Sequence, residues 1–216
     1  METVSHCKVL LLSGLVVLCF SVHAEVNDEI KQLQHEWARI KYTLDKNEQE
    51  AALEKLSLKA TAIRENQPDN ADAHLWEGTI LSTYSGAIGT LRALSTVNRS
   101  CDALELSIKI DPVASKGAAH TYLGALYILV PEWPIAFGDL EIDEEYLNKA
   151  IELNPEDIDV NYYYGYLLMK QRKYKESEIF YNKALLAPDR PGRDLADEGR
   201  RKDAKEQLEK VHAELE

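Results

Sequence analysis

Three stretches of the chain carry the same short signature, and this repetition limits the possible folds more than any other feature. Each stretch places a polar residue four positions before a glycine, in a run whose apolar residues recur at helical spacing. A second helical run follows each signature and ends at a proline, which cannot continue a helical hydrogen-bond ladder. The signatures are His74-x-x-Glu77-Gly78, His120-x-x-Leu123-Gly124 and Asn161-x-x-Tyr164-Gly165, and the ends are Asp111-Pro112, Asn154-Pro155 and Ala187-Pro188.

The glycine of each signature indicates close packing between the two helices of a pair. A glycine on one helix opposite a small residue on the next lets the helix axes approach each other. Ala150 and Ala184, which end two successive second helices, are 34 residues apart. We therefore expect Gly165 at a helix crossing. Gly192 follows the last pair in a surface connection, where we expect alanine to be tolerated.

This pattern resembles the tetratricopeptide repeat, in which Leu-Gly and an aromatic residue are followed by Ala, an aromatic residue, Ala and Pro. The resemblance implies an all-α, right-handed α-solenoid of helical hairpins, forming one domain over residues 25–216. We expect a degenerate helix pair at 27–68, repeats at about 71–112, 115–155 and 158–188, and a capping helix at 194–215. In the capping helix we expect Asp194 as the N-cap and Leu195, Ala204, Leu208 and Val211 facing inward.

The repeats differ in length, and the differences locate two insertions. Gly165 and Ala184 are 19 residues apart, whereas the matching positions are 26 apart in the preceding repeat and 29 apart in the one before it. The ten extra residues of the earliest repeat lie within 83–99, where they could simply lengthen its helices. The seven extra residues of the next repeat lie in a proline-containing segment at 130–139.

The N-terminus differs from the rest of the chain. Lys8 precedes a mostly apolar run from Val9 to Phe20, which ends at Ser21-Val22-His23-Ala24. A short apolar run closed by small residues is typical of a secretory signal. We expect a signal peptide over residues 1–24, cleavage between Ala24 and Glu25, and a periplasmic or secreted mature protein. The alternative is an uncleaved anchor, although a bilayer span needs about 20 apolar residues.

Composition excludes several classes of function. The chain has 37 acidic and 25 basic residues, a formal charge of −12, which disfavours nucleic acid because binding there depends on neutralising phosphates. The scattered histidines and cysteines match no metal motif, and no nucleophile stands in a catalytic signature. We predict no cofactor, no metal and no enzymatic activity. Cleavage of the signal would leave Cys101 as a single thiol, expected to be buried.

One helical face of the last repeat is the first candidate binding surface. Tyr162 and Tyr166 are four residues apart, with Asp159 and Lys170 before and after them on the same face. The tetratricopeptide resemblance implies that this face turns toward the concave groove of the array. Tyrosine suits binding because it combines apolar area with a hydroxyl group. The alternative is that these tyrosines pack against the final helix.

The 130–139 segment is the second candidate, because it carries Trp133 and Phe137 and is stiffened by Pro131 and Pro134. Large apolar side chains in a loop are costly unless they are buried or bind something, so the segment is either a structural plug or a ligand lid. With the signal, this segment is similar to exported helical proteins related to the T component of TRAP solute transporters. Two functions follow: a scaffold that binds a protein partner along the groove, or a periplasmic carrier of a small organic ligand, as an accessory transporter subunit.

Overall fold

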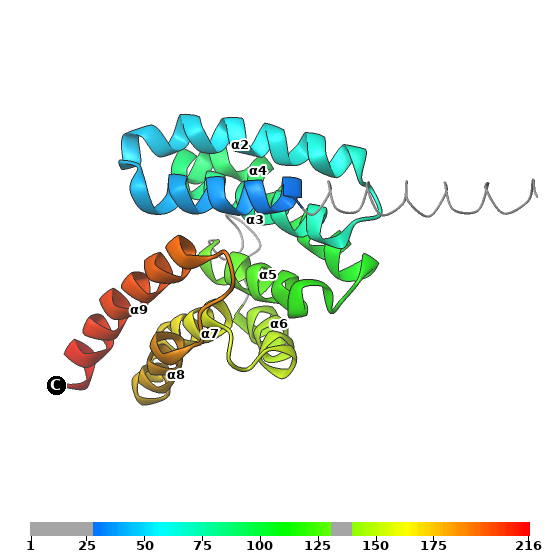
Figure 1. The fold of residues 1–216 in the computed structure, drawn as a ribbon. Helices are drawn as coiled ribbons and strands as arrows, with labels where there is room; N and C mark the ends of the chain where they lie inside the picture. The colour runs from blue at the N-terminus through cyan, green and yellow to red at the C-terminus, as the bar shows by residue number, and fades with distance from the viewer. Residues whose placement is uncertain (1–27, 131–139) are drawn as a thin grey trace, which may run out of the picture.

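The computed structural model describes residues 28–130 and 140–216, and within these ranges the regular structure is entirely helical (Figure 1). The first helix covers residues 28–43. The elements that follow are α2 (Lys46–Asn66), α3 (Ala71–Ile88), α4 (Thr90–Ile110), the 3₁₀ turn η1 (Ala114–Gly117), α5 (Ala118–Leu129), α6 (Leu140–Leu153), α7 (Ile158–Lys170), α8 (Tyr174–Leu186) and α9 (Asp194–Leu215).

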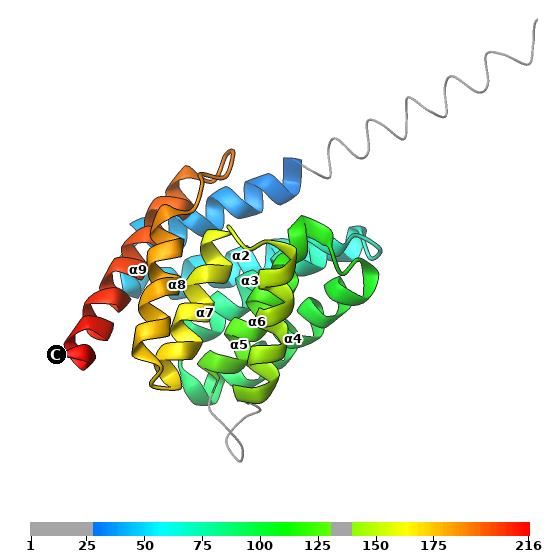
Figure 2. The same cartoon turned by 90° about the horizontal axis from the view of Figure 1, so that it is seen from below.

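Successive helices pack as hairpins, α3 with α4, α5 with α6 and α7 with α8, in an array like that of tetratricopeptide repeats (Figure 2). The predicted all-α solenoid is therefore confirmed. In two of these pairs, a side-chain cap starts the first helix of the pair. The Asn70 side chain accepts hydrogen bonds from the first turn of α3, and the Asp157 side chain accepts two from the first turn of α7, at 2.8 and 3.1 Å.

In two of the three repeats, the polar residue of the signature ties the first helix to the turn before it, whereas the ring nitrogens of His120 have no hydrogen-bond partner among the described residues. His74 Nε2 lies 2.8 Å from the carbonyl oxygen of Pro68, and Asn161 Nδ2 donates to the carbonyl oxygen of Pro155 at 2.9 Å. Both side chains are buried, and both contacts span six residues. The side chain at this position of the signature therefore holds the proline-containing turn against the helix that follows the turn.

The glycine of the signature lies where the two helices of a pair cross, as predicted. Ser100 Oγ donates to the carbonyl oxygen of Gly78, and Ser177 Oγ donates to that of Gly165, both at 2.7 Å. These contacts span 22 residues in the first case and 12 in the second. The ten-residue difference is the insertion read from the sequence. It lengthens α3 and α4 to 18 and 21 residues, against 13 each for α7 and α8.

The last helix also packs against the first one. Gly199 of α9 lies so close to Tyr42 that a Cβ atom there would be 2.4 Å from the Tyr42 ring. Tyr42 Oη donates to Asp203 of α9 at 3.4 Å, and His35 Nε2 lies 2.8 Å from the carbonyl oxygen of Gly192. In Figures 1 and 2, α9 accordingly runs beside α8 while its start lies near the first helix. The first and last described helices are therefore in direct contact.

Three expectations about the C-terminal segment are wrong. Leu195 is 37 % exposed, and Ala196 and Arg200 face inward in its place, whereas Ala204 and Val211 are buried and Leu208 is half-buried, as predicted. Asp194 is the first helical residue rather than the N-cap, and the residue before it, Arg193, makes no capping hydrogen bond through its side chain. Gly192 has φ +72°, so alanine is strained there because L residues disfavour the left-handed region.

Candidate functional site

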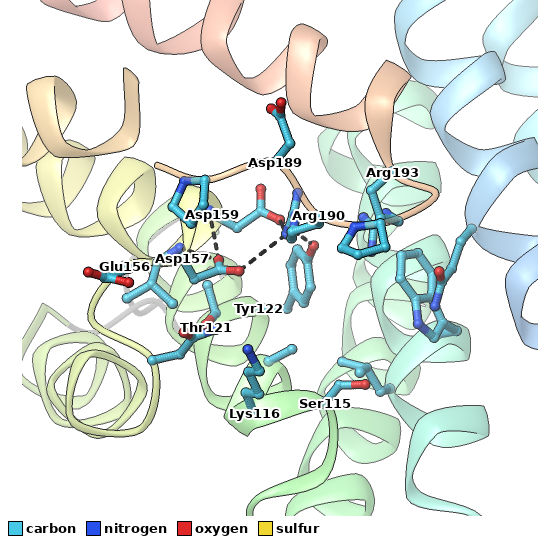
Figure 3. Close-up of a pocket in the computed structure, with 18 residues that line it drawn as sticks. Ser115, Lys116, Thr121, Tyr122, Glu156, Asp157, Asp159, Asp189, Arg190 and Arg193 are labelled. Atoms are coloured by element: carbon cyan, nitrogen blue, oxygen red, sulfur yellow. Dashed lines mark hydrogen bonds and ion pairs between the residues drawn. The ribbon is translucent and has the colours of Figure 1, made fainter. Parts of the chain in front are cut away.

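A cavity of about 380 Å³ opens at the N-terminal ends of α3, α5 and α7, between the first helix and the connection from α8 to α9 (Figure 3). Trp76 of α3 and Tyr122 of α5 give it aromatic walls. Its lining carries three basic and four acidic side chains, which are Lys116, Arg190, Arg193, Glu156, Asp157, Asp159 and Asp189.

The 3₁₀ turn η1 shapes one side of the cavity. Ser115 and Lys116 adopt left-handed backbone conformations, with φ 45° and 57°, and Gly117 follows at φ 79°. A Cβ atom on Gly117 would lie 2.4 Å from Leu153 Cδ1, so glycine is required there for space as well as for conformation. Ser115 Oγ donates to the Asp72 carboxylate at 2.7 Å, which ties the turn to α3. The turn thus delivers Lys116 to the cavity and starts α5 without a side-chain cap.

Arg190 fastens the α8–α9 connection across the opposite side. Its backbone N–H and its Nε each donate to the Asp197 carboxylate at 2.8 Å. Its Nη1 donates to Asp159 at 2.7 Å and lies 3.4 Å from Asp157. Hydrogen-bonded guanidinium–carboxylate pairs of this kind are roughly twice as strong as neutral hydrogen bonds. One arginine therefore joins the connection to both α7 and α9.

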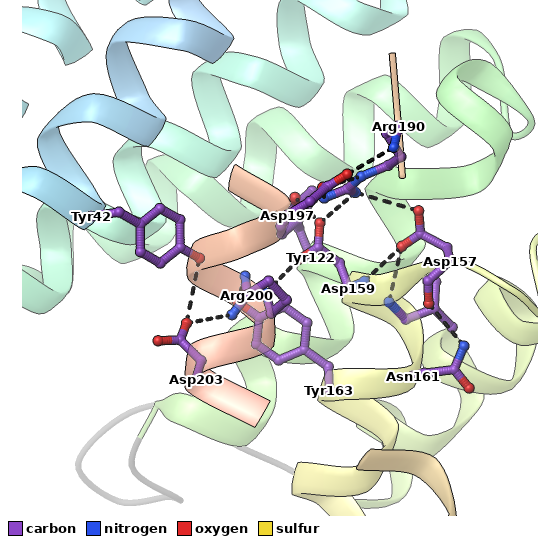
Figure 4. A network of polar contacts seen from close by, with 11 residues as sticks. Tyr42, Tyr122, Asp157, Asp159, Asn161, Tyr163, Arg190, Asp197, Arg200 and Asp203 are labelled. Carbon is purple, nitrogen blue, oxygen red and sulfur yellow. Dashed lines mark hydrogen bonds and ion pairs between the residues drawn. The ribbon is translucent and has the colours of Figure 1, made fainter. Parts of the chain in front are cut away.

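Asp159 is the buried acid at the centre of this network (Figure 4). Its carboxylate accepts from Arg190, from Arg200 Nε at 2.5 Å and from Tyr122 Oη at 3.0 Å. Burial by itself would raise the pKa of Asp159, but the neighbouring Arg190 and Arg200 guanidinium groups hold it well below the ordinary aspartate value. The carboxyl therefore stays ionised and holds charge rather than exchanging protons.

Arg200 brings the charge of α9 into the interior, where it is only 2 % exposed. Its guanidinium lies 4.4 Å from the ring centre of Tyr162 and 4.8 Å from that of Tyr163. Its Nη2 donates to Tyr163 Oη at 3.2 Å, and its Nη1 to Asp203, also at 3.2 Å. Asp203 in turn accepts from Tyr42 of the first helix (Figure 4). Arg200 thus connects α7 to the first helix through α9.

Arg193, at the end of the same connection, is used differently. Its guanidinium lies 5.0 Å from the ring centre of Trp76, but its Nε and Nη2 atoms are shielded from solvent and have no hydrogen-bond partner among the described residues. No ion pair joins it to any acid in the part of the chain that the structure describes. Arg193 is therefore a cation without a direct ion-pair partner among the described residues, although it contributes to lowering the pKa of the nearby Asp159.

The sequence model of the family described as "Tetratricopeptide repeat" matches residues 146–179, which run from within α6 through α7 into α8. The serine–glycine contact of this repeat, Ser177 to Gly165, recurs as Ser100 to Gly78 in the α3–α4 pair. The chain is a tetratricopeptide repeat protein.

Among solved structures, the array is similar to that of MamA, with a TM-score of 0.46 and 18 % identity over 79 % of this chain and 92 % of MamA. It is also similar to PilF of Pseudomonas aeruginosa, with a TM-score of 0.37 and 17 % identity over 88 % of this chain and 93 % of PilF. Both scores and both identities are low, so neither likeness bears on the function of this tetratricopeptide repeat protein. No curated protein matches the sequence.

The predicted binding residues of this repeat protein occupy different surroundings. Asp159 lies in the cavity wall, and Tyr162 is buried against Tyr181 and Arg200, beneath α9. Tyr166 is half-buried, and the exposed Lys170 places its ammonium 5.5 Å from the Tyr166 ring centre. The face thus has a half covered by α9 and an open half. Its role in binding stays a prediction. Trp133 and Phe137 lie outside the described residues, as do residues 1–24.

Sequence reasoning missed the residues that form most of the cavity. From the sequence, Arg190 and Arg193 belong to a surface connection and Arg200 belongs to the capping helix, with no sign that they form a site. Trp76 is not singled out either. A signal for Arg200 existed, because it stands four residues from both Ala196 and Ala204 on the buried side of α9. The partners of these arginines could not be inferred, since Asp159 lies 41 residues before Arg200 and Trp76 lies 117 residues before Arg193.

Chemistry other than binding finds little support among the described residues. No group of three or more His, Cys, Asp or Glu side chains there could hold a metal ion. Cys101 is half-buried rather than fully buried, and burial first of all, with Glu105 beside it, raises the pKa of its thiol to about 12. The reactive thiolate is therefore disfavoured. Within the described ranges, no helix has the length and apolar character to cross a membrane.

Proposed function

We propose that this protein is an exported binding protein that holds a segment of a partner protein. The observation that carries the proposal is the cavity at the ends of α3, α5 and α7. Its lining combines the Trp76 ring and apolar side chains with a few charged groups, and its size, about 380 Å³, is in the range of ligand sites. Tetratricopeptide repeat proteins act as scaffolds, and we propose no catalytic activity.

The partner surface extends, in this proposal, from the cavity along the open half of α7. Asp159 lies in the cavity wall, and Tyr166 and Lys170 lie further along the same helix, half-buried and exposed. Tyrosine is enriched among the interface residues that contribute most to binding energy. Trp133 and Phe137, outside the described residues, belong to the proposal on the strength of the sequence alone.

A second candidate is a carrier of a small organic ligand, an accessory to a TRAP-type solute transporter. The cavity favours it, because its volume suffices for a small molecule and its walls come from separate elements that together could enclose one. The export of the protein, in both cases, rests on the apolar run before Ala24.

Native mass spectrometry of the protein purified from its own compartment tests the two candidates. A co-purifying polypeptide supports the scaffold, and a retained small molecule supports the carrier. The surface is tested by the double variant Tyr166→Ala/Lys170→Ala, which we expect to weaken partner binding by about 2 kcal/mol or more if Tyr166 is an anchor.

The matched control is Lys149→Ala, which removes one exposed charge on α6, where Lys149 pairs with Glu152 at 3.0 Å. It should retain the partner. A partner held equally by the double variant would overturn the assignment of this surface. Protein that carries neither a chain nor a small molecule, when isolated from its own compartment, would overturn the proposed function as a whole.

A further inference from the structure

Two hydrogen-bond donors of the Arg193 side chain have no acceptor among the described residues. Nε and Nη2 lie on the same edge of the guanidinium group, and both are buried and unpartnered among the described residues. Leaving a buried donor unpaired is unfavourable, and more so when the donor belongs to a charged group. Such a cost at a cavity wall suggests a partner that binds from outside the chain.

Two other arginines of the same molecule show what fills this edge. Arg64 donates from Nε and Nη2 to the two oxygens of Glu77, at 2.7 and 3.3 Å. Arg190 donates from Nε and Nη2 to Asp197, at 2.8 and 2.5 Å. The edge is a planar fork that matches a carboxylate. In both examples a carboxylate accepts hydrogen bonds from the same two donor atoms that have no partner on Arg193.

The surroundings of Arg193 favour an anion of single charge. The lining carries three basic and four acidic side chains, and the partners Arg200, Arg201 and Asp197 bring the sum to five bases against five acids, so the cluster has no net charge. With four carboxylates in the lining, a second negative charge on the ligand would be unfavourable. The uncapped start of α5 adds partial positive charge at the same end.

The cavity also offers a further polar atom and an apolar surface. Thr121 is 1 % exposed and lines the cavity, and its hydroxyl oxygen has no hydrogen-bond partner within the described ranges. The apolar part of the lining would suit a short hydrocarbon group, and it comprises Leu75, Trp76, Ala118, Val160, Pro188 and Pro191.

We propose that Arg193 binds the carboxylate of a monoanionic ligand whose apolar part occupies this cavity. The inference rests on the proposed binding function and names the chemistry that the cavity recognises. Among the described residues, the Arg193 guanidinium stacks on Trp76 and makes no ion pair, so that binding requires its shielded fork to turn toward the ligand. The carboxylate can belong to a free organic acid or to the end of a partner polypeptide.

The probe for the free acid is sodium hexanoate, titrated into the full mature chain while the Trp76 indole N–H is followed by NMR. We expect hexanoate to bind and hexanamide, which lacks the charge, to bind at least about tenfold more weakly, since a hydrogen bond to a charged group contributes about 1.5–3 kcal/mol. Peptides with a free or an amidated C-terminus test the second source. Preference for the free C-terminus over hexanoate assigns the carboxylate to a polypeptide, and the reverse assigns it to a small acid.

Arg193→Gln should weaken binding of the favoured probe about tenfold or more, and Arg193→Lys should also weaken it, because lysine keeps the charge but lacks the fork. Arg39→Gln, which removes an exposed arginine of the first helix outside the cavity lining, should bind as wild type. Urea unfolding of each variant checks that the fold is retained.

Equal affinity of Arg193→Gln and wild type would overturn the inference, as would equal binding of acid and amide, or no binding of either carboxylate. Tighter binding of inorganic phosphate would overturn the monoanionic class. These results leave the proposed function standing if a partner still co-purifies in native mass spectrometry. Only the absence of any co-purifying partner or ligand removes both.

Discussion

Single hydroxyl groups and glycines hold the helix pairs in register. Ser177 Oγ contacts the Gly165 carbonyl oxygen, and the ring of Tyr181 packs directly on the same glycine, so that a Cβ atom on Gly165 would lie 3.1 Å from it. Tyr181 is fully buried and has little room to move. The spacing of α7 and α8 therefore depends on a residue without a side chain.

We predict that Gly165→Leu lowers the free energy of unfolding by about 1–3 kcal/mol, because the larger side chain overpacks the contact with Tyr181. The matched control is Gly86→Leu, at an exposed position of α3 where a Cβ atom meets nothing within 4 Å. There leucine should be neutral or slightly stabilising, since it favours helix over glycine. Equal urea midpoints for the two variants would contradict the repeat register.

Gly192 is limited by conformation rather than by space. A Cβ atom there would lie 3.8 Å from His35, which is an ordinary contact, but φ is +72°. We predict that Gly192→Ala lowers the free energy of unfolding by about 1–2 kcal/mol. Chemical denaturation checks this against Gly86→Ala, which should stabilise. An unchanged midpoint for Gly192→Ala would mean that the connection adopts another backbone conformation.

Asp159→Asn should be far more costly, because it leaves Arg190 and Arg200 without their shared carboxylate. Removing one partner of a buried ion pair costs about 3–5 kcal/mol. The pKa of Asp159 is lowered in the fold, so its stabilisation is complete above the unfolded-state pKa of about 3.9 and is lost as the pH falls through the folded value.

The difference in unfolding free energy between wild type and Asp159→Asn should thus be constant from about pH 7 to 5 and shrink below about pH 4. Urea titrations at several pH values measure it. Asp189→Asn, which breaks a pair with Arg201 at an exposed carboxylate, should have a small effect throughout. A difference that does not depend on pH would show that Asp159 is not held as an anion.

At the scale of helices, local signals predicted the boundaries well. The helix pair predicted at 27–68 is observed as the first helix at 28–43 and α2 at Lys46–Asn66, and the predicted capping helix at 194–215 is α9 at Asp194–Leu215. Prolines and helical spacing act within a few residues of the boundary that they set, and so can be read from the sequence. The orientation of α9 depends on its packing against α8 and the first helix, which local sequence patterns do not record. For that reason Leu195 was predicted on the inward side of α9.

The same distinction explains the candidate site. Asp159 was found because it lies on a patterned helix. Arg193 and Trp76 meet only because α9 folds back on the first helix, and nothing near either residue in the sequence records that contact. No motif of fixed spacing pointed to the cavity, because the residues that line it come from separate segments of the chain rather than from one repeat.

The contact between the first helix and α9 yields a prediction for these two elements. Gly199→Ala would place a Cβ atom 2.4 Å from the Tyr42 ring, so the helices must separate. We expect faster amide hydrogen exchange in residues 28–43 and in the first half of α9, with little change in α3 and α4. Exchange that rises uniformly over the chain would instead indicate a single cooperative unit.

At the scale of the whole molecule, export is the prediction that most affects function. We expect the protein isolated from its own cells to begin at Glu25, because the apolar run before Val22-His23-Ala24 has the form of a cleaved secretory signal. Intact-mass measurement of the protein in each cell fraction checks this. A mass that still includes residues 1–24 would contradict cleavage, and recovery from the cytoplasm alone would contradict export.

The pairing of the first helix with α9 also sets an order of events in folding. The hydrogen bonds between Tyr42 and Asp203 and between His35 and Gly192 span 161 and 157 residues, whereas the contacts within each hairpin are local. Local contacts form fastest, and closing a long loop costs entropy that must be met before its contacts form. As the chain is synthesised, hairpins can assemble one by one, and the apolar side of the first helix can pack early on α2 and α3, where Trp37 Nε1 donates to Thr83 Oγ1 at 2.8 Å. The side of the first helix that carries His35 and Tyr42 has to wait for nearly the whole sequence. During that wait this side is open to a chaperone, to a protease or to another unfinished copy.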